Sequence, residues 1–257
     1  MLKVIDVSQW NKVADWTSVA KNADAVIIRA GYRGYGSAGT LATDLRFKAN
    51  IDGALKAGMP VGIYWCSQAI SEAEAKQEAM YCHNLIRKYK ITYPVYLDSE
   101  KMSPNGTGRG DKLNKADRTK YGLAFCKAMA AYGYTVGLYC SESWYTANID
   151  GAAFKRAGFE TWIAKYSSVK PRFECDAWQY TSSGKISGIT GNVDISYFYK
   201  EYGAEKQDEI DITIQNAIED IGLNSPDLWE AVLRGKRTAT AGNVKALMDK
   251  YHKAVTK

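Results

Sequence analysis

Tyr93-Pro94-Val95-Tyr96-Leu97-Asp98-Ser99-Glu100 is an apolar run that ends in two carboxylates around one serine. A Val- and Tyr-rich run that opens at a proline predicts a short strand, and its continuous apolar character is typical of a strand buried on both faces of a parallel sheet. Side chains alternate along a strand, so Asp98 and Glu100 are expected on one side and Ser99 on the other. The alternative is an acidic strand end that merely meets solvent.

Two carboxylates at the carboxyl end of a buried strand lie where α/β folds place their chemistry. Mutual repulsion and partial burial separate the pKa values of neighbouring carboxyl groups, so that one stays protonated near neutral pH while the other is ionised. Such a pair suits the cleavage of a glycosidic bond, in which one acid protonates the leaving oxygen and negative charge stabilises an oxocarbenium-like centre.

The composition predicts a globular protein. With 257 residues, 46% hydrophobic and 24% charged, the chain can bury one large core and a small additional unit. No apolar run is long enough to span a bilayer and the first residues lack a secretory pattern, so we expect no membrane partner and synthesis in the cytoplasm. The five cysteines form no Cys-x-x-Cys pair, which favours free buried thiols over disulfides or zinc. We expect no metal and no cofactor.

The formal net charge of +6 belongs to residues 1–205, because residues 206–257 hold 8 Lys/Arg and 8 Asp/Glu. A basic body could be drawn to nucleic acid or to an anionic cell wall. Its cations are scattered and no nucleic-acid motif is present, so we expect no nucleic-acid partner.

The first part of the chain repeats strand, loop, helix and stop, which is the pattern of βα units. The predicted strands are residues 3–8, 25–31, 60–67, 93–98 and 135–141. Helices are predicted at about 71–89, 115–132 and 143–157, in a short stretch with Trp16, Val19 and Ala20, and in a helix whose apolar face carries Leu45, Ala49 and Leu55. Asp44 and Asp52 on that last helix are expected to be solvated.

Residues 160–166, 175–181 and 193–198 also have strand character. About a dozen residues or fewer separate them, which is scarcely enough for a helical crossover, so we expect hairpins between them. The predicted fold class is therefore α/β, an irregular eight-stranded (β/α) barrel with about five helices.

Seven motifs in order resemble the glycoside hydrolase family 25 lysozymes over roughly residues 1–200. They are Asp6-Val7-Ser8, Ile28-Arg29-Ala30-Gly31, Val61-Gly62-Ile63-Tyr64, Leu97-Asp98-Ser99-Glu100, Trp162-Ile163-Ala164-x-Tyr166, Trp178-Gln179-Tyr180 and Val193-Asp194-Ile195-Ser196. The resemblance implies an eight-stranded barrel with five helices. It also implies a retaining N-acetylmuramidase that cuts the β-1,4 bond between N-acetylmuramic acid and N-acetylglucosamine in peptidoglycan.

By the same resemblance Glu100 is the general acid/base, and Asp6, Asp98 and Asp194 match the other active-site carboxylates. Asp6 and Asp194 lie inside apolar strands, where an unpaired acid is costly, so a functional role is favoured for both. Retention through a carboxylate nucleophile or through the substrate's own N-acetyl group is left open. We favour N-acetyl assistance, with Asp98 or Asp194 steadying the charged intermediate.

The candidate sugar-binding residues are Tyr64, Tyr139, Tyr166 and Trp178, which could offer rings to sugar faces and hydroxyls to sugar oxygens. Large aromatics in barrel strands also commonly belong to the core. Arg29 could pair with one of the acids and lower its pKa, or could be a satisfied buried charge.

Beyond Gly203 the chain changes character. Apolar stripes at residues 210–221, 225–233 and 244–255 predict a three-helix module over 204–257, after a catalytic barrel over 1–203. Residues 206–230 carry 1 Lys/Arg against 7 Asp/Glu, and residues 231–257 carry 7 against 1. The segment Asn224-Ser225-Pro226-Asp227-Leu228-Trp229 resembles a small module at the ends of prophage-encoded wall lysins. We expect wall targeting or a homodimer, with a passive stabilising cap as the alternative.

Three functions are compatible with these residues. The favoured one is a muramidase of the phage or prophage endolysin type, made in the host bacterial cytoplasm and released through a holin. A chitinase-like enzyme is disfavoured because its longer Asp-x-x-Asp-x-Asp-x-Glu pattern is absent from the strand that ends in Asp98-Ser99-Glu100. A non-catalytic wall-binding barrel is disfavoured because all four carboxylates are present.

Overall fold

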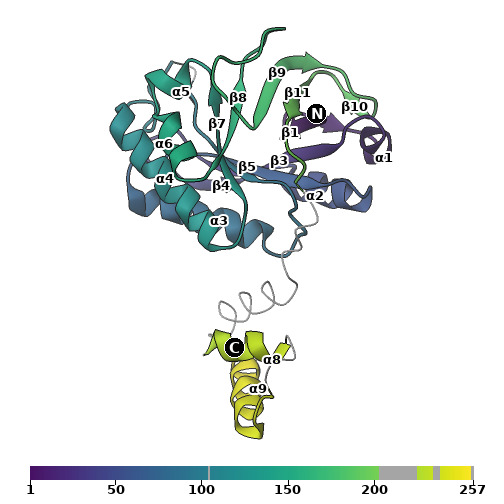
Figure 1. Cartoon of the computed structure of the whole chain (residues 1–257), viewed down its shortest axis with the longest axis vertical. Helices are drawn as coiled ribbons and strands as arrows, with labels where there is room; N and C mark the ends of the chain where they lie inside the picture. Colours follow the sequence, from purple (N-terminus) through teal and green to yellow (C-terminus); the bar gives the residue numbers. More distant parts are fainter. Residues whose placement is uncertain (104, 203–224, 234–237, 256–257) are drawn as a thin grey trace. The chain divides into compact units, whose positions relative to one another are not determined.

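The computed structural model describes residues 1–103, 105–202, 225–233 and 238–255 (Figure 1). The chain divides into two compact units, Met1–Gly203 and Ala204–Lys257. In the part of the chain that the structure describes, no helix combines the length and the apolar content needed to cross a bilayer.

The first unit is a closed eight-stranded barrel, as the strand pattern predicts. Its strands are β1 (Leu2–Val7), β3 (Ala25–Arg33), β5 (Val61–Cys66), β6 (Val95–Asp98), β7 (Val136–Ser141), β8 (Glu160–Ala164), β9 (Ala177–Gly184) and β11 (Val193–Phe198). They pair in the order β1-β11-β9-β8-β7-β6-β5-β3, and a parallel β1–β3 pairing closes the ring. Strand β11 runs antiparallel to both of its neighbours, β9 and β1.

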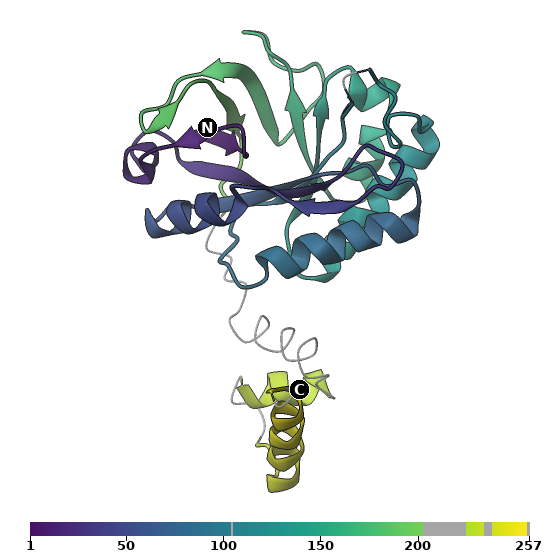
Figure 2. The same cartoon turned by 180° about the vertical axis from the view of Figure 1, so that it is seen from behind.

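Three short strands lie beside the ring. Strand β4 (Leu41–Thr43) pairs with the second half of β3, and β2 (Lys12–Val13) forms a small ribbon with β10 (Ile189–Thr190). The helices of this unit are α1 (Trp16–Ala20), α2 (Phe47–Lys56), α3 (Glu72–Ile86), α4 (Lys115–Ala131), α5 (Trp144–Ala147) and α6 (Gly151–Arg156). Helices α2, α3, α4 and α6 pack on the outer face of the parallel strands, as Figure 2 shows from behind.

The helix predicted at 143–157 is two short helices. The first helix ends at Asn148 because side chains of α4 form hydrogen bonds with the backbone there. Arg118 donates from Nη1 to the carbonyl oxygen of Asn148 (2.9 Å), and the Asp150 N–H donates to Thr119 Oγ1 (2.9 Å).

The predicted hairpin between the strands at 160–166 and 175–181 is wrong, because β8 and β9 are parallel. The twelve residues from 165 to 176 reach about 40 Å when extended, whereas the five residues of β8 span about 16 Å. An extended loop therefore returns the chain to the start of the next strand without a helix. Strands β9 and β11 pair antiparallel, as expected.

The predicted apolar face of α2 is wrong at Leu45 and Ala49, whereas Leu55 is partly buried against the core. The helix begins at Phe47, and it buries Phe47, Ile51 and Ala54. Leu45 precedes the helix and is 87% exposed, and Ala49 is exposed.

Aromatic rings fill the interior of the barrel. Tyr96, Trp162 and Phe198 are at most 2% exposed, and their ring centroids lie 5.0 to 6.2 Å apart. Tyr93 and Tyr202 pack below them, at the amino ends of the parallel strands. This plug leaves the carboxyl ends of the parallel strands as the open end of the barrel.

The second unit contains α8 (Pro226–Leu233) and α9 (Ala241–Val255), close to the second and third predicted stripes. Thr240 caps α9, since its Oγ1 accepts the Asn243 N–H (3.2 Å). Apolar side chains of this unit remain exposed, among them Leu233, Val244 and Met248. The stripe predicted at 210–221 lies outside the described residues.

The packing of the plug gives a stability test. A Cβ atom at Gly137 of β7 would lie 2.4 Å from the Tyr96 ring and 2.8 Å from a backbone oxygen of Glu160. We expect Gly137→Ala to lower the free energy of unfolding by about 1–3 kcal/mol, measured by urea denaturation. Gly36→Ala is the matched control, because no atom lies within 4 Å of a Cβ at Gly36. Equal stability of the two variants would contradict the packing described.

Candidate active site

Four acids meet at the open end of the barrel. Asp6 is next to last in β1, Asp98 ends β6, and Glu100 follows it by two residues. Because β11 is antiparallel to β1, its start meets the end of β1, and Asp194 lies directly opposite Asp6 in the pairing. Directly paired residues have Cβ atoms about 4.5–5.5 Å apart. Three distant segments thus bring together the four carboxylates that the sequence singles out.

The acids differ in depth. Asp98 is 2% exposed and Asp6 8% exposed, whereas Glu100 is an exposed residue. One oxygen of Asp98 accepts a hydrogen bond from the Cys66 thiol (3.0 Å), and the other has no hydrogen-bond partner among the described residues. The cluster therefore has a buried floor and an accessible Glu100.

Burial raises the pKa of every acid in the cluster, and repulsion from a neighbouring acid adds to it for Asp6, Asp98 and Glu100. Loss of hydration is the largest cause for each of them. The neighbouring Asp194 charge adds to it for Asp6 and for Glu100, and raises the pKa of Glu100 to about 7. The Glu100 charge in turn raises the pKa of Asp98. The four groups titrate as a set, and near neutral pH they hold fewer than four negative charges.

A buried amide connects Asp6 with two tyrosines. Gln179 of β9 is 2% exposed, and its Nε2 donates to Asp6 Oδ2 (2.8 Å). Its Oε1 accepts from the hydroxyls of Tyr139 (2.8 Å) and Tyr166 (3.1 Å). The amide hydrogen bond favours the ionised form of Asp6 and so partly offsets the effect of burial on its pKa.

The sequence profile described as "Glycosyl hydrolases family 25" matches residues 5–189, which includes Asp6, Asp98, Glu100 and Gln179. The chain belongs to glycosyl hydrolase family 25. The resemblance read from the seven motifs is thereby confirmed.

Two curated relatives are lysozymes. The chain is 24% identical over 200 residues to the "Autolytic lysozyme" of Clostridium acetobutylicum, which covers 77% of this chain and 56% of the relative. It is 26% identical over 205 residues to "Lysozyme M1" of Streptomyces globisporus, covering 76% of this chain and 66% of the relative. The chain thus spans less than two thirds of either relative.

Solved structures share the barrel. The modular autolysin LytC from Streptococcus pneumoniae, solved with a synthetic peptidoglycan ligand, superposes with a TM-score of 0.65 at 27% identity. That match covers 77% of this chain and 46% of LytC. The CTP1L endolysin superposes with a TM-score of 0.63 at 26% identity, covering 78% of this chain and 67% of the endolysin.

The predicted sugar-binding aromatics of this family 25 barrel fall into two groups. Tyr64, Tyr139 and Tyr166 surround the acids, and burial is the main cause that raises the pKa of each, to about 12 for Tyr166. Trp178 faces the other way, since its neighbour Gln179 points to the acids. Its indole N–H donates to the Lys165 carbonyl oxygen (2.8 Å) and its side chain is 5% exposed, which leaves little ring surface for a sugar.

Arg29 pairs with Asp44 rather than with one of the four acids. The Nε–Oδ2 distance is 2.7 Å, and Asp44 is 2% exposed. The expectation that Asp44 is solvated is therefore wrong, because Asp44 also caps the turn before α2 by accepting the Arg46 N–H (2.8 Å). The positive charge of Arg29 still lowers the pKa of Asp98.

Sequence reasoning missed two residues of the site, Gln179 and Cys66, which donate hydrogen bonds to the floor acids. Outside these contacts, Trp10 lies 80% exposed on the loop after β1. That loop is fixed by hydrogen bonds, including one from the Gln9 N–H to Asp44 (2.9 Å). Alternation along the strand means that either Gln179 or its two neighbours, Trp178 and Tyr180, point into the barrel. The sequence does not tell which, because the choice depends on the register with β8.

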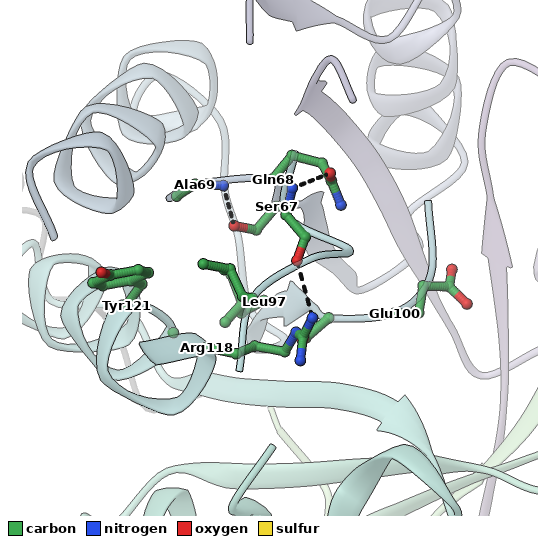
Figure 3. Close-up of a pocket in the computed structure, with 11 residues that line it drawn as sticks. Ser67, Gln68, Ala69, Leu97, Glu100, Arg118 and Tyr121 are labelled. Carbon is green, nitrogen blue, oxygen red and sulfur yellow. Dashed lines mark hydrogen bonds between the residues drawn. The ribbon is translucent and has the colours of Figure 1, made fainter. Parts of the chain in front are cut away.

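A hollow lies behind the end of β6, and of the four acids it is lined by Glu100 but not by Asp6, Asp98 or Asp194. It is lined by Ser67, Gln68, Ala69, Leu97, Ser99, Glu100, Gly110, Leu113, Arg118, Tyr121 and Gly122. In Figure 3 the Glu100 carboxylate points away from Leu97, Arg118 and Tyr121. Gln68 and Arg118, which line the hollow, bind the backbone of the loop that follows Glu100.

The coupling of the acids predicts a pH effect. Asp194→Asn removes a negative neighbour, which favours ionised Glu100 and lowers its pKa below about 7. We expect the alkaline limb of the pH–rate profile to move to lower pH. The exposed Asp52→Asn of α2 is the control and should leave both limbs in place. An unchanged alkaline limb in the Asp194 variant would show that the two charges do not interact.

Proposed function

We propose that this family 25 barrel is a lysozyme that hydrolyses the β-1,4 bond between N-acetylmuramic acid and N-acetylglucosamine in peptidoglycan, with retention of configuration. The observation that carries the proposal is an accessible carboxyl group with a pKa of about 7, Glu100, above buried acids. A general acid acts best when its pKa lies near the working pH, because it is then still protonated and yet a ready donor. The lysozyme relatives and the autolysin solved with a peptidoglycan ligand support the substrate class.

In the proposed reaction Glu100 gives its proton to the glycosidic oxygen as the bond to C1 breaks. The carbonyl oxygen of the substrate's N-acetyl group attacks C1 and forms a cyclic, positively charged intermediate. Glu100, now ionised, takes a proton from water, and the hydroxide adds to C1 and releases the N-acetyl group. Two inversions at C1 give net retention.

Asp98 has the position to steady this intermediate. Its buried carboxylate has one oxygen held by Cys66 and one without a partner among the described residues. That free oxygen can accept the acetamido N–H and so orient the attacking group, while its charge stabilises the cation. Asp194 adds negative charge that, together with burial, keeps the pKa of Glu100 high enough for proton donation, and Asp6 lies beside it as a further acid.

Two exposed rings on segments at the open end of the barrel suit sugar faces. Tyr166 is 60% exposed although its hydroxyl reaches Gln179, and Trp10 is 80% exposed. Both follow the carboxyl ends of parallel strands, β8 and β1, as Glu100 follows β6. We assign Tyr166 and Trp10 to glycan contact, with Tyr64 and Tyr139 deeper in the site.

The first test removes the proton donor. We expect Glu100→Gln to reduce the release of reducing ends from purified peptidoglycan on the order of 10²–10⁴-fold, with chitin as the control polymer. The anomer first formed by the wild-type protein, read by NMR, tests retention.

The same variant must stay folded. The pKa of Glu100 is raised in the folded protein, so its contribution to stability is present at acid pH and lost as pH rises through about 7. At pH 8 the free energy of unfolding of Glu100→Gln, measured by urea denaturation, should therefore be at least as large as that of the wild type. A folded variant within tenfold of wild-type activity would exclude Glu100 as the acid.

We further propose that the protein is an endolysin-type lysozyme whose second unit serves wall attachment or self-association. The exposed Leu233, Val244 and Met248 and the charge division of residues 206–257 support this. A second contact on an insoluble polymer raises the local enzyme concentration.

The corresponding test is a chain that ends at residue 203. We expect it to keep activity on soluble glycan fragments and to lose activity on intact walls, because the second contact is gone. Light scattering at two salt concentrations should show a smaller mass if the unit also mediates self-association. Equal wall lysis together with equal mass would leave the second unit a passive cap.

A further inference from the structure

The Gln179 amide is the central contact between Asp6 and the tyrosines, and its orientation is fixed by chemistry. In the observed orientation its nitrogen faces Asp6 Oδ2 at 2.8 Å. Rotation of the amide by half a turn would place its oxygen there, against a carboxylate that can only accept when ionised. The ionised form of Asp6 and the orientation of Gln179 therefore stabilise each other.

The amide orientation decides what the tyrosines do. Oε1 of Gln179 accepts from Tyr139 at 2.8 Å and from Tyr166 at 3.1 Å, and the Tyr139 hydroxyl also lies within hydrogen-bonding reach of the Tyr166 oxygen. Because a phenol oxygen has two lone pairs, each of these two oxygens still has at least one lone pair for another donor. A sugar hydroxyl or an acetamido N–H is such a donor.

We propose that Gln179 is a positioning residue that holds Asp6 as a charged acceptor and turns Tyr139 and Tyr166 into acceptors for the substrate. The inference rests on the proposed function only for its kinetic consequences. Gln179 touches no reacting atom itself. Its effect passes through three side chains from β1, β7 and the segment after β8.

Asp6 is surrounded by titratable groups from the other strands, and any pH effect must include them. The groups that face it are Asp98 and Glu100 at the end of β6, Asp194 of β11, Tyr64 of β5, Tyr139 of β7 and Tyr166 after β8. On β3, Arg29 is bound to Asp44. Loss of the amide donor would leave Asp6 among repulsive neighbours, with no compensating donor among the hydrogen bonds described for it.

Two substitutions should shift the pH dependence in opposite directions. Gln179→Met keeps the side-chain length but removes the donor, so the pKa of Asp6 rises and the acid limb of the pH–rate profile moves to higher pH. In Gln179→Glu the new carboxyl group imitates the amide only while protonated, when it can donate to Asp6 and accept from the tyrosines. Its activity should therefore recover as the pH falls. At the wild-type optimum we expect kcat/KM to drop on the order of 10²-fold in both.

A measurement that needs no activity completes the test. Carboxyl ¹³C NMR titration should show a higher pKa for Asp6 in Gln179→Met than in the wild type. Tyr166→Phe removes one donor to Oε1 but leaves the Asp6 contact, so it should leave that pKa in place. The exposed Gln77→Met on α3 is the matched control for the Gln-to-Met change.

The outcomes are distinguishable. If the wild type releases no reducing ends from peptidoglycan, the proposed function fails while the NMR titration still decides the role of Gln179. If Gln179→Met is unstable by thermal unfolding, the direction of the Gln179→Glu profile decides it. An Asp6 pKa that is equal in wild type and Gln179→Met, or a Gln179→Glu profile that keeps the wild-type shape, overturns the inference.

Discussion

Repulsion among four carboxylates at one end of a barrel is the constraint on which the site depends. Every one of these acids has a raised pKa, so each opposes folding increasingly as it ionises. The stabilisation that opposes this effect comes from the uncharged aromatic interior and the apolar outer core of the barrel. Tyr96, Trp162 and Phe198 close the interior below the acids, and apolar residues under α2, α3 and α4 bury the outer face. The barrel can thus keep a charged cluster because its core lies elsewhere.

The loop after Glu100 is held from its far side. Asp111 accepts the N–H groups of Met102 and Ser103 (3.0 Å each), and Gln68 accepts the Gly110 N–H (2.8 Å). Arg118 donates to the Gly110 carbonyl oxygen (2.9 Å). Backbone bonds of this kind restrict where Glu100 can point. A proton donor needs such restriction, because small displacements from the leaving oxygen reduce the rate strongly.

The sequence predicts this barrel, and it singles out the acids that the barrel brings together, for physical reasons. Buried strands leave apolar runs, and acids inside such runs, as at Asp6 and Asp194, are too costly to be accidental. What it could not predict depends on register and on distant partners. The parallel pairing of β8 with β9 decides that Gln179 faces inward and Trp178 outward. Arg29 of β3 pairs with Asp44, which lies in the turn before α2. From the sequence alone Asp44 resembles a surface residue, because its burial depends on how β3 and α2 pack together.

The donors to the floor acids are an amide and a thiol, and their neutrality has a consequence. A cation in the place of Gln179 would lower the pKa of Asp6 further, but its charge would also act on Glu100 and lower the pKa of the proposed proton donor. Arg29 comes close to such a cation, yet its guanidinium is bound by the Asp44 carboxylate, which reduces its net field at the acids. Neutral donors therefore orient Asp6 and Asp98 while the negative field that keeps Glu100 protonated near pH 7 remains intact.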